Sequence, residues 1–322
     1  MYTNKRKLSF GLAMTFVAVL PLLLLVKKQQ IIDWTQLRNY KPDSIISKLA
    51  VDTTMSSLGK HLFYVNHPTL HEKSTFGGHC KITEQTNILG CYVSGDGIYL
   101  YNVKDLRLSG IKEATSAHEM LHVAYERLSA TEKVRVNKML LDVYSKVTDT
   151  RLKNTIASYK KAGADTTNEL HSILGTEILA LTPDLENYYK KYFINRTAVV
   201  KYFNQYQNAF EERKNKVEQY DISLASIKSR IENLEYDLKN EASSLENERS
   251  RMNNLIANNQ VSEYNQAVPI FNRRIEAYNN KTKVVKQLID EYNGIVIARN
   301  NIATEENELI KAIDSSPVNI KV

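Results

Sequence analysis

Residues 114–128 read Ala-Thr-Ser-Ala-His-Glu-Met-Leu-His-Val-Ala-Tyr-Glu-Arg-Leu, and this stretch decides the fold of the central part of the chain. Small and apolar residues recur in it at helical spacing, which predicts an amphipathic helix. His118 and His122 are four residues apart, so both imidazoles lie on one face of that helix and can reach one cation. Glu119 then lies beside the metal, where it can act on a water molecule.

The His-Glu-x-x-His pattern is rare enough to be informative. Only 7 of the 322 residues are histidines, so chance produces the pattern in on the order of one in a hundred such chains. The alternative interpretation is a pair of surface histidines with an unrelated glutamate between them. The pattern therefore favours a metal site on the helix.

A catalytic zinc site needs a third protein ligand and an open fourth position, and three downstream residues are candidates. Glu169 lies in the first turn of a helix predicted from Thr166, where its alternative role is to complete a capping box. Glu177 is predicted in the middle of that helix on an apolar face, where an unpaired carboxylate is costly. Burial therefore makes Glu177 either a ligand or the partner of a ligand. His171 is a further candidate, as a ligand or as a donor to the transition state.

The motif at 118–122, followed by Asn168-Glu169 at a helix start, resembles the gluzincin metallopeptidases, the thermolysin-like branch of the zincins. The resemblance covers roughly residues 60–195. It implies a zincin-like domain in which His118, His122 and Glu169 bind Zn²⁺ and Glu119 is the general base.

The match to that family is incomplete at the third ligand. Ile173 stands four residues after Glu169, where several branches have an acidic residue, so Glu177 stays open as the alternative ligand. The family pattern also includes an edge strand before the metal-binding helix, which aligns the substrate by β-augmentation. Residues 98–103 occupy that place in this sequence.

The activity that the resemblance implies is hydrolysis of peptide bonds in a protein or peptide substrate. Zinc activates a water molecule, and Glu119 takes its proton and returns it to the leaving amine. A hydrogen-bond donor must also stabilise the oxyanion. His171, Tyr125, Tyr188 and Tyr189 carry suitable donors, and the sequence does not choose among them.

Most of the β signal lies between residues 61 and 103. Residues 61–65 are predicted to form a strand, and residues 89–94 and 98–103 to form a hairpin around Gly95-Asp96-Gly97. Glycine and aspartate are favoured in such a turn because they accept positive φ.

The only two cysteines, Cys80 and Cys91, lie in this region. In an oxidising compartment they are expected to form a disulfide, and the alternative is a pair of free thiols. The disulfide expectation favours an extracytoplasmic location.

From about residue 109 onward the chain is predicted to be helical almost throughout. Capping boxes at Ser129–Glu132 and Thr166–Glu169 mark two helix starts, and Thr182-Pro183 marks a third. Gly163 is expected to end the helix that precedes Thr166.

Two heptad series follow and predict an antiparallel coiled-coil hairpin, because a polar break at 258–260 separates them. The first series recurs every seven residues at Phe203, Phe210, Val217, Leu224, Ile231, Leu238, Leu245 and Met252, and a second series offset by three includes Tyr206. Beyond the break, heptads run from Phe271 to Ile310. The hairpin is expected to bind a protein partner or to mediate self-association.

The N-terminal segment predicts a transmembrane signal anchor. Basic residues 5–7 precede an apolar run at 8–26, which Lys27 and Lys28 terminate. Nineteen residues at about 1.5 Å per residue match the hydrocarbon core of a bilayer, and no small-residue cleavage site follows. Basic residues on both sides leave the orientation open. A soluble part outside the cytoplasm is expected, and a protease that faces the cytosol is the alternative.

The composition excludes several other classes. The chain has 11 Gly, 6 Pro and 2 Cys, too few for a collagen-like, low-complexity or disulfide-framework protein. The mean hydropathy of −0.39 excludes a polytopic membrane protein. The net charge is +7, but basic and acidic residues alternate along the heptads, as on solvated helix faces, so no nucleic-acid site is expected.

The sequence thus predicts an α+β, mostly α protein in four parts. Residues 1–30 form a cytoplasmic tip and anchor, 31–198 a zincin-like metallopeptidase domain, 199–315 the hairpin, and 316–322 a tail. The predicted protein is a single-pass, membrane-anchored zinc metallopeptidase. The alternative is a membrane-anchored interaction or adhesion protein whose zincin domain is inactive or binds metal for structure.

Overall fold

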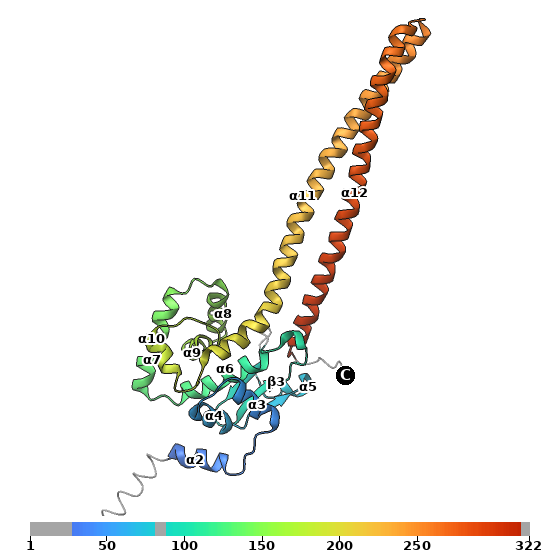
Figure 1. The fold of residues 1–322 in the computed structure, drawn as a ribbon. Helices are drawn as coiled ribbons and strands as arrows, with labels where there is room; N and C mark the ends of the chain where they lie inside the picture. Colours follow the sequence, from blue (N-terminus) through green and yellow to red (C-terminus); the bar gives the residue numbers. More distant parts are fainter. Residues whose placement is uncertain (1–27, 81–87, 317–322) are drawn as a thin grey trace, which may run out of the picture. The chain divides into compact units, whose positions relative to one another are not determined.

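The computed structural model describes residues 28–80 and 88–316 of the chain. The predicted anchor at 8–26 and residues 317–322 of the predicted tail lie outside the described residues. Within these, the protein is mostly helical with a small three-stranded sheet, so the α+β, mostly α prediction is confirmed (Figure 1). No helix in the described ranges is both long and apolar enough to cross a membrane.

The chain divides into two compact units. The first comprises residues 1–207 and 312–322, and the second comprises residues 208–311. The predicted boundary between 198 and 199 falls near the start of helix α11 (Arg196–Ala257), which continues through both units. The first residues of α11, up to Gln207, therefore belong to the first unit.

Short elements precede the central helix of the first unit, and four further helices follow it. The elements are α2 (Lys28–Leu37), α3 (Ser44–Asp52), α4 (Ser57–Tyr64), β1 (Thr69–His71), α5 (Lys73–Phe76), β2 (Gly90–Val93), β3 (Gly97–Tyr101), η1 (Leu106–Leu108), α6 (Ile111–Glu126), α7 (Ala130–Lys146), α8 (Thr150–Lys161), α9 (Thr166–Thr176) and α10 (Pro183–Tyr189). The central helix is α6, the one that carries the histidine motif.

The sheet has the order β1-β3-β2. Strands β2 and β3 form the predicted antiparallel hairpin, and β1 pairs with β3 in parallel. The prediction that residues 98–103 form an edge strand is therefore wrong, because β3 has a neighbour on each side. The edge strand next to α6 is β2.

The strand predicted at 61–65 is also wrong, because these residues fall in and just after helix α4. The Ser56 side chain caps this helix by accepting a hydrogen bond from the Gly59 N–H. Gly59, Leu62 and Phe63 are buried at helical spacing. Packing of this face and the cap outweigh the strand propensity of the Phe-Tyr-Val sequence.

Helix starts match the predictions at two positions out of three. Ser129 and Glu132 form the predicted capping box of α7, and Pro183 begins α10 after Thr182. The capping box predicted at Thr166–Glu169 is wrong. The side chain of Asp165 caps α9 by accepting from the backbone N–H groups of Thr167 and Asn168, which leaves the Glu169 carboxylate free of capping.

The predicted position of Glu177 in the middle of a helix is likewise corrected, because α9 ends at Thr176 and Glu177 is its C-cap. Arg196 is almost fully buried beyond this end. Its guanidinium donates to the carbonyls of Ile178 and Leu179 and forms an ion pair with Glu186. These contacts hold the segment that follows α9 in place.

Helices α6 and α9 cross closely at Gly175. A side chain at this position would meet Leu121 of α6 and, at 2.9 Å, Tyr189 of α10. Met120, Leu121 and Val123 of α6 are fully buried in the core that α9 covers. The close crossing brings the start of α9 over the histidine face of α6.

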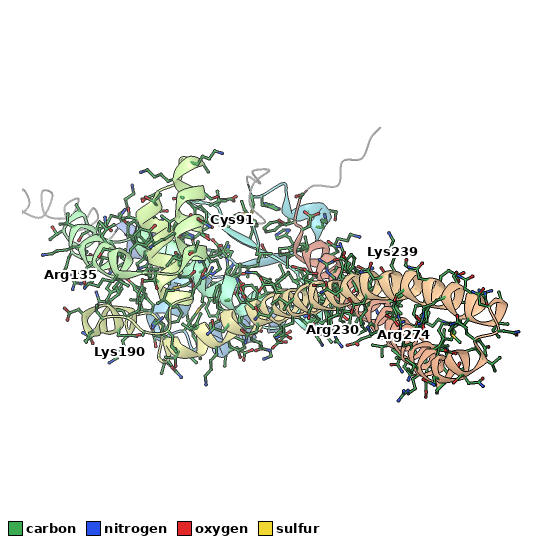
Figure 2. The ribbon with its side chains drawn as sticks, turned by 90° about the horizontal axis from the view of Figure 1, so that it is seen from above. Cys91, Arg135, Lys190, Arg230, Lys239 and Arg274 are labelled. Atoms are coloured by element: carbon green, nitrogen blue, oxygen red, sulfur yellow. A yellow bond between two sulfur atoms is a disulfide. The ribbon has the colours of Figure 1, made fainter. Side chains whose placement is uncertain are left out.

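In the second unit, α11 runs beside α12 (Val261–Ile313) as two antiparallel helices (Figure 1). Leu238, Leu245 and Met252 are buried at seven-residue spacing. Arg274 of α12 forms an ion pair with Glu241 of α11, and Figure 2 labels Arg274 on α12 and Arg230 and Lys239 on α11. The helical hairpin is therefore present as a structural unit.

Candidate metal centre

Helix α6 presents His118, Glu119 and His122 as one group. The nearest ligand atoms of the three side chains all lie within 4.8 Å of one another. The imidazole rings of His118 and His122 have centroids 4.8 Å apart and stand nearly perpendicular. The two rings therefore converge on one position, as the four-residue spacing predicts.

Glu169, in the first turn of α9, completes the group. Its Oε2 atom lies 3.8 Å from Nε2 of His118 and 3.7 Å from Nε2 of His122. This oxygen is buried and has no hydrogen-bond partner. Three donor atoms from two helices thus surround one point, and a buried carboxylate oxygen faces it without a protein partner.

The distances suit a tetrahedral metal ion. Zinc binds imidazole nitrogen and carboxylate oxygen at about 2.0–2.2 Å, so neighbouring ligands of a tetrahedral site lie about 3.4 Å apart. The observed separations between Glu169 and the two histidines exceed this value by a few tenths of an ångström. These two separations are therefore close to those of ligands that share one ion.

Asn168 orients one of the two imidazoles. Nδ1 of His122 lies 3.0 Å from Oδ1 of Asn168. When Nδ1–H donates this hydrogen bond, Nε2 carries the lone pair that a metal requires. The residue before Glu169 therefore acts as a supporting contact, a role that the sequence analysis did not assign.

The two histidines hold different charge states in the metal-free protein. Burial lowers the pKa of His118, but the nearby carboxylates of Glu169, Glu119 and Glu177 outweigh burial and raise it to about 8. Burial and the neighbouring His118 charge lower the pKa of His122 to about 4.

Glu119 is almost fully buried beside the two histidines. Burial raises its pKa to about 7, although the His118 charge and the Tyr92 N–H oppose the shift. Gly90 of β2 makes room for it, since a side chain at Gly90 would meet Glu119 Cγ at 2.9 Å and Thr115 Cγ2 at 2.6 Å. A carboxylate with a pKa near neutrality is suited to take up and return a proton.

Glu177, the alternative third ligand, is placed in the same cleft but with another partner. Its Oε2 atom forms an ion pair with Arg151 of α8 at 2.8 Å. Among the described residues, Glu169 forms ion pairs with both histidines, whereas Glu177 forms its ion pair with Arg151. Glu177 therefore contributes negative charge near His118, while Arg151 offsets that charge.

His171 lies in the core and is fully buried. Its Nε2 atom is 2.9 Å from the Tyr188 hydroxyl, and its ring contacts Tyr125, Tyr189 and Tyr192. Burial lowers its pKa to about 3. His171 and the tyrosines at 125, 188 and 189 are absent from the lining of the cleft described below.

A cleft of about 140 Å³ opens beside His118 and Glu119, which is room for several water molecules. Its lining residues, apart from these two, are Ile88, Leu89, Gly90, Ala114, Thr115, Tyr159, Thr176, Glu177, Phe203 and Tyr206. The heptad pattern assigns Phe203 and Tyr206 to the seam of the hairpin, but both line this cleft.

Tyr159 and Tyr206 are the two phenols of the cleft. Burial raises the pKa of both, and so does the charge of Glu177, so both hydroxyls keep their protons. The sequence gives Tyr159 no role, and only its position in α8 brings it here. These phenols, in place of Tyr125, Tyr188 and Tyr189, are the tyrosine donors that face the cleft.

The disulfide expected between Cys80 and Cys91 is present in the structure, with Cα atoms 5.8 Å apart. Cys91 belongs to the edge strand β2, next to Leu89 and Gly90, which line the cleft. The covalent link therefore ties this wall to the residues that follow α5.

No family model, curated protein or solved structure matches the chain. The function is therefore argued from the geometry of the site.

Proposed function

We propose that this protein is a membrane-anchored, zinc-dependent metallopeptidase of the gluzincin type. The observation that carries the proposal is the Glu169 carboxylate oxygen, buried without a hydrogen-bond partner and 3.7–3.8 Å from Nε2 of His118 and His122. Leaving such an atom unpaired is costly unless a cation occupies the space between the three groups.

The donor set favours zinc among the divalent ions. Two imidazoles and one carboxylate are the protein ligands of one class of catalytic zinc site, in which a fourth position stays open. Calcium and magnesium prefer sites built from oxygen atoms alone. His118, His122 and Glu169 would hold the ion, and Asn168 would fix the tautomer of His122.

A zinc ion held by these residues would lower the pKa of a water molecule to about 7 and would polarise a substrate carbonyl group. Glu119 accepts the proton of the attacking water and returns it to the leaving amine, as its pKa near 7 suits both steps. The protonated hydroxyls of Tyr159 and Tyr206 are placed in the cleft to donate to the oxyanion.

The edge strand β2 supports a peptide as substrate. Backbone groups of β2 that do not pair with β3 point to its outer side, and Leu89 and Gly90 line the cleft beside Glu119. An extended peptide can add to such an edge through main-chain hydrogen bonds. This binding mode selects polypeptides without fixing their side chains.

The anchor at 8–26 and the disulfide support a single-pass protein whose soluble part lies outside the cytoplasm, since disulfides persist in oxidising compartments. The hairpin is proposed to bind a protein partner or a second copy of the chain.

The proposal is tested with the full chain, purified in detergent and assayed on a peptide library by mass spectrometry. The chain loaded with one zinc ion is expected to cleave peptides. Cleavage is expected to cease when a chelator removes the metal and to return when zinc is added. Cleavage that persists without metal would refute a metallopeptidase. A chain that binds zinc and cleaves no member of the library would favour the second candidate.

That second candidate is a membrane-anchored interaction or adhesion protein with an inactive or structural metal site. The size of the hairpin favours it, since α11 and α12 comprise 62 and 53 residues. Ile222 and Ile297 are exposed on its surface. Both candidates share the anchor and the hairpin, so only the hydrolysis assay separates them.

A further inference from the structure

Helix α2 (Lys28–Leu37) follows directly on the N-terminal apolar run and has two faces of different character. Asp33 is its one buried residue and is 6% exposed. Ile31 and Trp34 are 45% and 61% exposed, and with Arg38 just beyond the helix end they follow the spacing of one helix face. Asp33 faces His61 and Arg127, and Trp34 and Arg38 line the pocket that borders it.

The buried face is fixed to the helix that carries the metal site. Nη1 and Nη2 of Arg127 donate to the two carboxylate oxygens of Asp33 at 2.6 and 2.8 Å. Nε2 of His61 lies 2.8 Å from one of these oxygens. Arg127 is the C-cap of α6. A bidentate pair of this kind is geometrically specific, so α2 has a defined orientation relative to α6.

The outer face has the chemistry of a membrane interface. Tryptophan combines a large apolar ring with a polar N–H and is enriched where bilayer and water meet. Arg38 lies over the Trp34 ring, 5.5 Å from its centroid, and extends the face with a positive charge. Lys28 and Lys41 add positive charge at the two ends of the segment.

The chain itself indicates what covers this face. The apolar run ends at Val26, two residues before α2 begins, and Lys27 and Lys28 mark the expected edge of the hydrocarbon core. If the run spans a membrane, α2 has no linker that would let it leave the surface. The exposed apolar side chains and the basic residues of α2 then lie at the level of the lipid headgroups.

We infer that α2 is an interfacial helix, which lies on the bilayer with Ile31 and Trp34 inserted among the headgroups. Through Asp33 and Arg127 it holds α6, and with it the metal site, in one orientation over the membrane. This inference rests on the proposed membrane anchor, and it depends neither on bound metal nor on hydrolysis.

Trp34 provides the test because it is the only tryptophan of the chain. The full chain is reconstituted into vesicles of phosphatidylcholine with phosphatidylglycerol, and Trp34 fluorescence is measured with iodide in the water or with brominated lipids in the bilayer. Interfacial helices insert about 5–10 Å into the headgroup and acyl boundary. Bromine near the headgroup end of the acyl chain is therefore expected to quench Trp34 strongly, and iodide weakly.

The matched control moves the probe to the hairpin. Tyr236 is 67% exposed on α11, so the double variant Trp34→Phe, Tyr236→Trp is expected to respond to iodide and not to brominated lipid. If wild-type Trp34 behaves like this control while the protein floats with the vesicles, the inference is wrong and the anchor stands. If the protein does not float with the vesicles, both are wrong.

A second variant tests the connection to α6. Asp33→Asn keeps the shape of the side chain but weakens the pair with Arg127. Trp34 is expected to stay protected from iodide by the lipid, while its fluorescence anisotropy falls because α2 moves independently of the domain. Circular dichroism verifies that the variant is folded. Unchanged anisotropy in the folded variant would refute the connection.

Discussion

Replacing Glu169 by Gln isolates the contribution of the proposed third ligand. The substitution keeps the side chain's shape and removes the charge from an oxygen that lies 3.7–3.8 Å from the two Nε2 atoms. Structural zinc binds with about 10–16 kcal/mol through four ligands, so each ligand contributes about 3 kcal/mol. Loss of one ligand is therefore expected to weaken zinc binding on the order of a hundredfold.

The assay is competition between the full chain and a fluorescent zinc chelator at pH 7.5. Glu177→Gln is the matched control, because Glu177 lines the same cleft but forms its ion pair with Arg151. Its zinc affinity is expected to change less than about tenfold, in the range of residues that support the ligands. Loss of affinity in the Glu177 variant with retention in the Glu169 variant would refute the assignment.

Three further predictions concern protonation, packing and the disulfide. Zinc must displace the proton of His118, whose pKa is about 8, so the affinity of the protein for zinc should fall about tenfold per pH unit below that pH. A zinc affinity that does not change between pH 6 and 8, measured by the same competition assay, would contradict this. Gly175→Ala should lower the free energy of unfolding, measured with urea, by about 1–3 kcal/mol, because the added methyl group meets Leu121 and Tyr189. The control Gly294→Ala lies in open space on α12 and should not lower it. Cys80→Ser with Cys91→Ser should cost roughly 2–3 kcal/mol, because the disulfide closes a short loop; equal unfolding midpoints for the wild type with and without reductant would argue against this.

The parts of the fold that the sequence predicts are those with strong local signals. The helix at 111–126, the β2–β3 hairpin, the Ser129 capping box and the helical hairpin all follow from periodicity, turn residues or caps. The strand predicted at 61–65 fails because packing of α4 against the core outweighs the local preference. The order of the strands in the sheet could not be predicted from the sequence, because β1 has only three residues and gives no periodic signal.

At the site, the sequence identifies the group on α6 and leaves the third ligand open. The ambiguity arises from a shift of one residue, because Asp165 rather than Thr166 caps α9 and so frees Glu169. Tyr159 could not be found, since only the packing of α8 beside α9 brings it to the cleft. His171 resembled a site residue because of its neighbours in sequence, but its side chain points into a tyrosine-lined core.

The measurement that most directly tests the proposed function is peptide hydrolysis by the Glu119→Gln variant, with its zinc content determined in the same preparation. Glu119 lies beside the ligands and is the proposed proton acceptor. The variant is expected to bind one zinc ion per chain, as the wild type does, and to lose at least about a hundredfold in kcat/KM. Wild-type hydrolysis by the zinc-loaded variant would contradict the mechanism.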